Sequence, residues 1–175
     1  MRTRALVAGL LLLVVAGTSS RLFACGDKFL TLGLGTRYER SPAARQAAAI
    51  ILYADPGSEL SRTLATLSVE ASLKKEGYRP TIIASAAELD TALRARKWDV
   101  LVVDGSNSQR VRNAGGPHVV PVLIRPTKDE LKQARNLYHS VINTPTKSRL
   151  FLDTIEDAVD LHEAEARAAA RATTH

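Results

Sequence analysis

The chain has 175 residues, of which 45% are hydrophobic and 24% charged, and its formal net charge is +6. This length and composition suit one globular domain with one hydrophobic core. Three basic residues, Arg2, Arg4 and Arg21, precede Cys25, and without these three the net charge falls to +3. Because the surplus is small and no basic run is interleaved with aromatic residues, the sequence excludes a nucleic-acid-binding class.

The N-terminus has the layout of a bacterial secretory signal. Arg2 and Arg4 precede an unbroken apolar run over residues 5–16, and small residues follow it. The run is shorter than the roughly twenty residues that a membrane-spanning helix needs. We therefore expect residues 1–24 to be a signal peptide that is removed during export.

Cys25 is the only cysteine of the chain, and it directly follows this segment. The sequence Leu22-Phe23-Ala24-Cys25 resembles the lipobox of bacterial lipoproteins, in which the cysteine is lipidated and becomes the mature N-terminus. The resemblance implies a membrane anchor at Cys25. It also implies a periplasmic location at the outer membrane, since Gly26 is not an acidic retention signal for the inner membrane. The alternative is ordinary cleavage after Gly17, which leaves a soluble periplasmic or secreted protein with a free thiol.

Residues 25–46 contain glycines and a proline and predict an irregular lead-in. Beyond it, short apolar runs alternate with amphipathic segments. The apolar runs predict five buried strands, over residues 48–53, 79–84, 98–104, 119–124 and 140–143.

The amphipathic segments predict helices with recognisable N-caps. We expect one helix from Ser58 to Gly77, one opened by Ser85, one opened by Thr127, and a last one that begins near Lys147. Residues 105–117 are expected to form a polar loop with a short helix at 109–113.

This alternation predicts an α/β domain over residues 47–162, followed by an Ala- and Arg-rich tail over 163–175. The expected fold is flavodoxin-like, a doubly wound five-stranded parallel sheet in the order 2-1-3-4-5. In that order the first and third strands are neighbours. Asp55 and Asp104, which end these strands, should therefore meet at the topological switch point.

From Ile50 to about Leu161 the chain resembles response-regulator receiver domains. The motifs that carry the resemblance are Tyr53-Ala54-Asp55-Pro56, Trp98-Asp99-Val100-Leu101-Val102-Val103-Asp104, Val120-Pro121-Val122-Leu123-Ile124 and Asn143-Thr144-Pro145. The resemblance implies a receiver-like fold, with Asp104 at the phosphoacceptor position and Asp55 at one of two metal-binding acid positions. It also implies a surface for a protein partner over residues 131–161.

The chain departs from the family at three positions. Ala54 stands at the second acid position, Pro126 at the hydroxyl position and Thr144 at the lysine position. A divalent cation thereby loses a carboxylate ligand, and phosphoryl oxygens lose a fixed positive charge. We therefore expect no phosphotransfer and no enzymatic activity.

The candidate crevice residues are Asp55, Asp104, Ser106 and Asn107. One hypothesis is structural: Asp55 caps the following helix, and Asp104 accepts hydrogen bonds from residues 105–108. The other is that Asp55 and Asp104 bind Mg²⁺ or Ca²⁺ weakly. The four histidines lack metal-ligand spacing in the sequence.

The sequence thus predicts an exported, lipid-anchored binding or scaffold module of the cell envelope that needs no cofactor. Two alternatives remain open. The first is a small enzyme or ligand sensor that depends on a divalent metal at Asp55 and Asp104. The second is a cytoplasmic receiver domain that has lost part of its site.

Overall fold

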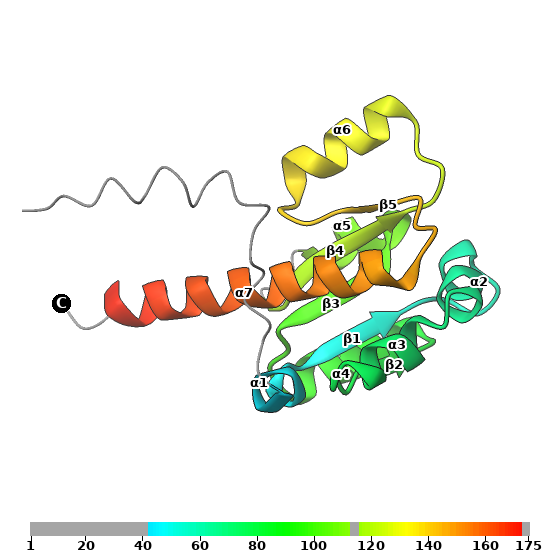
Figure 1. The fold of residues 1–175 in the computed structure, drawn as a ribbon. Coiled ribbons are helices and arrows are strands. Elements are labelled where there is room, and N and C mark those ends of the chain that lie inside the picture. Colours follow the sequence, from blue (N-terminus) through cyan, green and yellow to red (C-terminus); the bar gives the residue numbers. More distant parts are fainter. Residues whose placement is uncertain (1–41, 113–115, 173–175) are drawn as a thin grey trace, which may run out of the picture. The chain divides into compact units, whose positions relative to one another are not determined.

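The computed structural model describes residues 42–112 and 116–172. Their centre is one parallel sheet with helices on both faces (Figure 1). The strands are β1 (Ile50–Tyr53), β2 (Thr81–Ile83), β3 (Val100–Asp104), β4 (His118–Leu123) and β5 (Ile142–Asn143). They pair in the order β2-β1-β3-β4-β5, and every pair is parallel. The predicted flavodoxin-like sheet order is therefore confirmed.

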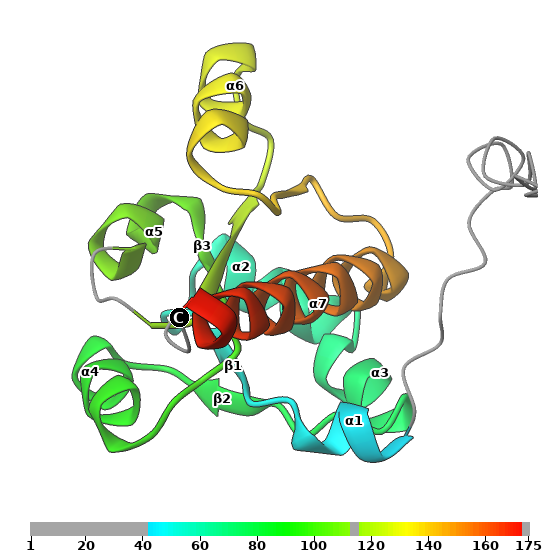
Figure 2. The same cartoon turned by 90° about the vertical axis from the view of Figure 1, so that its left-hand side faces the viewer.

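The described helices pack in two layers, one on each face of the sheet (Figure 2). They are α1 (Pro42–Ala47), α2 (Glu59–Thr66), α3 (Val69–Lys75), α4 (Ala86–Ala95), α5 (Gly105–Arg112), α6 (Lys128–Leu137) and α7 (Ser148–Ala172). Side chains of α2, α3 and α7 share one core cluster with the sheet, and side chains of α4, α5 and the end of α6 share the other.

The strands supply both cores because successive side chains point to opposite faces. In β1, Ile50 and Leu52 belong to the core under α2, α3 and α7, whereas Ile51 and Tyr53 belong to the opposite core. All four residues of β1 are buried. This double burial explains why the strand is apolar at every position instead of alternating.

The helix expected from Ser58 to Gly77 is instead two helices, which was a wrong prediction. Ser68 separates α2 from α3 and has a left-handed backbone, with φ of 49°. That conformation costs roughly 1–2 kcal/mol for a residue with a side chain. The break turns Val69 and Leu73 into the core, both fully buried. Burying each contributes about 1.5–3 kcal/mol, which outweighs the cost.

The segment 105–117, predicted as a loop with a short helix at 109–113, instead begins with a helix over Gly105–Arg112. Helix α5 begins at Gly105, immediately after β3. A Cβ atom at Gly105 would overlap the Leu123 side chain, so glycine lets the helix start directly against the end of β4. Asp104 caps the helix, since its Oδ1 accepts from the Ser106 backbone N–H at 2.9 Å.

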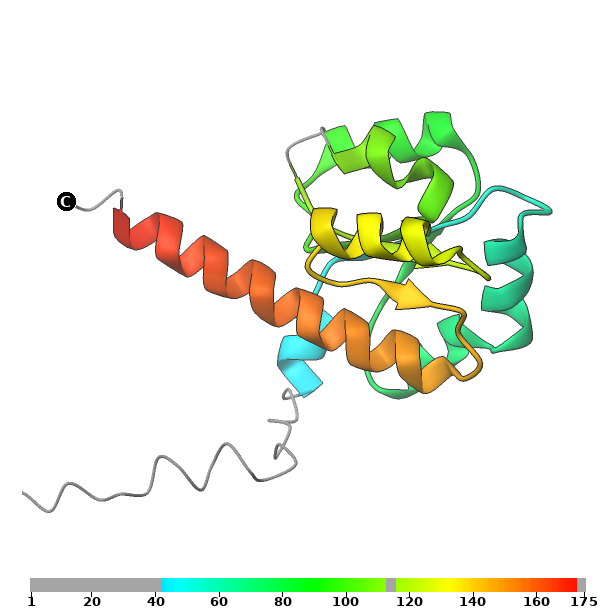
Figure 3. The same cartoon turned by 90° about the horizontal axis from the view of Figure 1, so that it is seen from above.

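The start of the described chain is more helical than expected, and its last helix is long. Helix α1 lies within the predicted irregular lead-in, and Pro42 occupies its first position, where proline is favourable. Helix α7 continues to Ala172 and runs past the end of the sheet (Figure 3). No helix in residues 42–112 and 116–172 is long and apolar enough to cross a bilayer.

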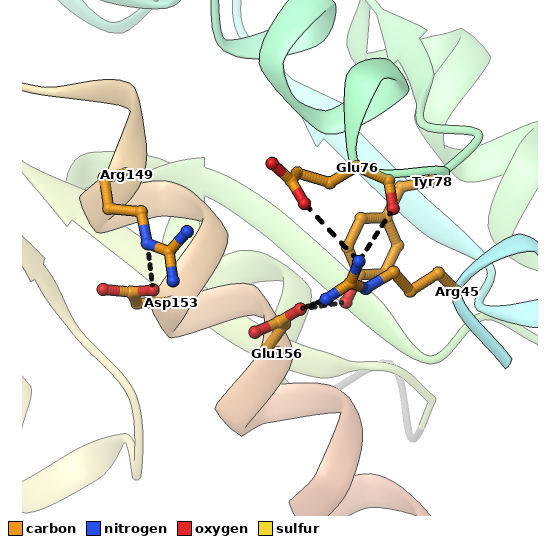
Figure 4. A network of polar contacts seen from close by, with 6 residues as sticks. All are labelled: Arg45, Glu76, Tyr78, Arg149, Asp153 and Glu156. Carbon is orange, nitrogen blue, oxygen red and sulfur yellow. Dashed lines mark hydrogen bonds and ion pairs between the residues drawn. The ribbon is translucent and has the colours of Figure 1, made fainter. Parts of the chain in front are cut away.

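Arg45 joins α1 to the body of the domain (Figure 4). Its guanidinium lies 3.4 Å from Glu76 Oε2 and 3.1 Å from Glu156 Oε1 on α7. The Tyr78 hydroxyl donates to the same Glu156 oxygen at 3.2 Å. The Arg45 side chain is only 13% exposed, so this pairing is less screened by solvent than a surface ion pair. It holds α1 and the end of α3 against α7.

Candidate functional site

The candidate crevice lies where β1 and β3 end. The chain leaves β1 toward β2 and leaves β3 toward β4, so the two connections diverge at this point. In parallel α/β sheets, ligands bind at such a switch point beyond the carboxyl ends of the strands. Tyr53 pairs with Val103 in the β1–β3 register. Asp104 and Asp55 therefore follow at nearly the same level.

Asp55 is held by two side chains that flank it. The Tyr53 hydroxyl donates to Oδ1 at 2.6 Å, and Asn107 Nδ2 donates to Oδ2 at 3.1 Å. The structure thus brings Asp55 and Asn107 together across the switch point. Asp55 does not cap α2, because the Ser58 hydroxyl oxygen accepts from the Ser61 N–H at 3.0 Å. That part of the structural hypothesis was wrong.

Asp104 is used by the helix that follows it. Its Oδ1 accepts from both the backbone N–H and the hydroxyl of Ser106, at 2.9 Å and 2.7 Å. These contacts agree with the hypothesis that Asp104 binds the segment after β3. Ser106 therefore donates to its near neighbour Asp104, whereas Asn107, the next residue, donates to Asp55 after β1.

In the present side-chain arrangement the crevice has few unengaged oxygen ligands for a hard cation. Mg²⁺ and Ca²⁺ prefer several oxygen ligands, including more than one carboxylate. Each Asp55 oxygen already accepts a hydrogen bond. In the part of the chain that the structure describes, no three His, Cys, Asp or Glu side chains are placed to hold a metal ion. The geometry favours the structural role of the two acids.

Tyr53 is a crevice residue that the sequence reasoning missed. Burial raises the pKa of its phenol, and the hydrogen bond and charge of Asp55 raise it further, whereas Arg110 lowers it. The phenol therefore keeps its proton and serves as a donor. The signal was present in the sequence, because residues 53 and 55 are two apart in an extended segment and point the same way.

The positions where the receiver family has its phosphoryl-binding groups hold other contacts here. Ala54 is buried and apolar. The Thr144 hydroxyl oxygen accepts from the Arg125 backbone N–H at 3.1 Å, which fixes the turn after β4 to the end of β5. The Arg125 guanidinium pairs with Glu59 on α2. The nearby cation and hydroxyl thus both have structural partners.

Three further polar residues of segment 105–118, Ser108, Arg110 and Arg112, lie in two different places. Arg110 lies close enough to Tyr53 to affect its pKa. Ser108 is buried and accepts from the Tyr138 hydroxyl at 3.0 Å. The Arg112 guanidinium lies 6.0 Å from the centre of the Tyr138 ring. Asn107 and Arg110 therefore belong to the crevice, whereas Ser108 and Arg112 do not.

Two further predicted sites are on other parts of the chain. Cys25, the predicted lipidation site, lies outside the described residues. The predicted partner surface, residues 131–161, comprises most of α6, all of β5 and the first half of α7.

No protein-family model matches the chain, and no curated protein sequence matches it. Two solved structures are similar. One contains a yeast Spc42 trimeric coiled coil, amino acids 181–211, fused to another protein; it is 16% identical, with a TM-score of 0.54 over 69% of this chain and 81% of that chain. The other is a CheY-like response regulator receiver domain protein from Methanospirillum hungatei JF-1. It is 19% identical, with a TM-score of 0.52 over 68% of this chain and 99% of that chain. The likeness to the receiver domain, together with the sheet order, confirms the receiver-like fold.

The Tyr53–Asp55 hydrogen bond should give stability a particular pH dependence. The pKa of Tyr53 is raised above 10.0 in the folded state. The protonated phenol therefore adds to the free energy of unfolding at neutral pH, and this contribution is lost as the pH rises above the folded-state pKa. Tyr53→Phe should cost about 1 kcal/mol near neutral pH. The difference from wild type should shrink above pH 10.

Urea unfolding of both proteins across this pH range measures the effect. Asp55→Asn is the matched variant: it keeps an oxygen acceptor but removes the charge, so the loss should begin at lower pH. A difference between wild type and Tyr53→Phe that does not change with pH contradicts this interpretation of the bond.

Proposed function

We propose that this protein is an exported, lipid-anchored, receiver-like binding or scaffold module of the cell envelope that does not take up phosphate. The observation that carries the proposal is the state of the crevice. Its two acids, Asp55 and Asp104, accept hydrogen bonds from Tyr53, Ser106 and Asn107. A receiver-like fold whose crevice groups are engaged internally is suited to presenting a surface, not to a phosphoryl reaction.

The expected absence of phosphoryl transfer follows from the residues at the cation-binding and lysine positions. Phosphoryl transfer depends on a cation and fixed positive groups that neutralise the oxygens of the transferred group. Here Ala54 gives no ligand for the cation, and Thr144 gives no charge. Arg125 donates its backbone N–H to Thr144, but its guanidinium is paired with Glu59.

Acetyl phosphate tests this part of the proposal. The purified full chain, incubated with acetyl phosphate and Mg²⁺, should show no phosphoryl adduct by intact mass, while an active receiver domain treated in parallel is modified. An adduct on the wild type that disappears in Asp104→Asn would contradict the proposal.

The partner surface is proposed on residues 131–161, and its packing supports this. In α6 only Ala134 is buried, so this helix contributes little to the core. Among the described residues the exposed large apolar side chains are Ile82, Leu137, Leu150 and Leu161. All but Ile82 lie in or at the end of this surface. Three of the four exposed large apolar side chains thus belong to this surface, and exposed apolar side chains are a common feature of protein interaction sites.

Photo-crosslinking in cells tests the surface. A benzophenone amino acid at Leu137 or Leu150 should yield the same discrete crosslinked partner. Placed at Ile82, which is equally apolar and 46% exposed but lies on the opposite edge strand, it should not. Products that are the same at all three positions, or absent from Leu137 and Leu150, would contradict the assignment.

The anchor at Cys25 is proposed from the lipobox-like sequence and the secretory layout that precedes it. Wild-type protein in cells fed an alkyne fatty acid should be labelled and should fractionate with the outer membrane. Cys25→Ser should abolish the label, since no other cysteine is present. A label that persists in Cys25→Ser would overturn the anchor, and a wild type found unlabelled in the cytoplasm would overturn export.

A further inference from the structure

A pocket of about 410 Å³ lies at the amino end of the sheet, opposite the end that holds the crevice. Four parts of the chain line it: the end of α4, the segment before β3, the segment before β4, and α7, which runs past this end of the sheet (Figure 3). Val100 pairs with His118 in the β3–β4 register. The residues just before these two strands therefore lie at the same level and face one pocket.

The wall of this pocket is mostly apolar. Its apolar side chains are those of Leu93, Trp98, Pro117 and Ala166. The Trp98 ring is fixed in place, because its Nε1–H donates to the Ala92 carbonyl oxygen at 2.8 Å and the residue is only 5% exposed. An apolar wall with a few polar groups, in a volume of about 300–1,000 Å³, is typical of small-molecule sites.

The charged groups that line the pocket are cations. Arg96 and Lys97 line it, and no Asp or Glu does. The Arg96 guanidinium lies over the Trp98 ring, 3.7 Å from the ring centre. A guanidinium stacked on an aromatic face keeps N–H donors at its edge available for an anion. Within residues 42–112 and 116–172, neither cation forms an ion pair with a carboxylate.

The carboxylates near the pocket are engaged elsewhere. Asp99 Oδ1 lies 3.7 Å from Nε2 of His162, which also lines the pocket. The other Asp99 oxygen accepts the Ala49 backbone N–H at 2.6 Å. Glu165 lines a neighbouring hollow instead. The positive charge at this pocket is therefore left for a ligand.

The helix dipole accounts for only part of this positive charge. Cations are favourable in the last turn of a helix, and Arg94 occupies the last turn of α4. Arg96 and Lys97 come after that turn, and the Arg96 backbone is extended, with φ of −158°. These two side chains line a concave and partly apolar wall, which the helix dipole does not require.

We propose that this pocket binds an amphipathic anion, a small molecule with one acidic group and a short hydrocarbon chain. Arg96 and Lys97 hold the acidic group, and the hydrocarbon chain lies against Leu93 and Trp98. A bare anion leaves the apolar wall uncovered, and an uncharged apolar molecule leaves the two cations without a partner. The pocket shares no residue with the crevice or with surface 131–161, so the proposal is independent of the function proposed above.

Trp98 is the only tryptophan of the chain, so its fluorescence reports directly on this pocket. Octanoate, titrated into the full chain below its micelle concentration, should change the Trp98 emission saturably. Equal concentrations of 1-octanol, which has the chain without the charge, should change it little. Inorganic phosphate, which has the charge without the chain, should also change it little. Added salt should weaken the binding of octanoate.

Charge-removing variants test the role of each cation. Arg96→Gln and Lys97→Gln should each weaken octanoate binding roughly fivefold or more, since each removes a hydrogen bond to a charged group. Arg94→Gln is the matched control: it removes a cation from the same end of α4 but not from the pocket, and it should bind as the wild type does. Circular dichroism should show that all three variants remain folded.

Four results would overturn the proposal. The first is a Trp98 emission that octanoate does not change. The second is an equal response to 1-octanol or to phosphate. The third is wild-type binding by both Arg96→Gln and Lys97→Gln. The fourth is a loss of binding in Arg94→Gln as large as that in the other two variants.

Discussion

The pairing of β1 with β3 is the constraint on which the rest of the structure depends. Both strands are buried on both faces, so their register is fixed by packing as well as by backbone hydrogen bonds. That register sets Tyr53 against Val103 and brings the ends of the two strands together. Because α5 starts at once with Gly105, Asn107 lies within reach of Asp55. Packing of the core therefore positions the crevice, and polar side chains of the crevice hydrogen-bond to one another.

Because of these hydrogen bonds, the polar groups at the two ends of the sheet differ in whether they have partners. At the carboxyl end, the acids are engaged by Tyr53, Ser106 and Asn107, and the remaining contacts hold turns in place. At the amino end, an imidazole nitrogen of His118 is buried without a partner. In a receiver-like fold the carboxyl end is where ligands are expected. Here a buried imidazole nitrogen without a hydrogen-bond partner lies at the other end, and three of the four exposed large apolar side chains of the described residues lie on α6 and α7.

The sequence was sufficient to predict the strands and their order. It was insufficient to predict the helix boundaries and side-chain contacts that form the candidate site. Strand positions and order follow from apolar runs and from the rules for parallel connections, which are local patterns and general topology. The break at Ser68 could not be predicted in this way, since it depends on how deeply Val69 and Leu73 bury against the sheet. Asp55 and Asn107 were both chosen as candidates, but their contact depends on where α5 begins. The pocket at the amino end of the sheet was not predicted, because the segments that line it meet only in the tertiary fold.

We propose that internal hydrogen bonds occupy the switch point and that it does not bind a phosphoryl moiety. Titration of the isotope-labelled protein with Mg²⁺ and beryllofluoride, which mimics a phosphoryl group on an aspartate, tests this directly by NMR. The account predicts that the amide signals of Ser106 and the side-chain amide of Asn107 stay unchanged. Saturable shifts at these two residues, with the Asn107 side chain released from Asp55, would contradict it.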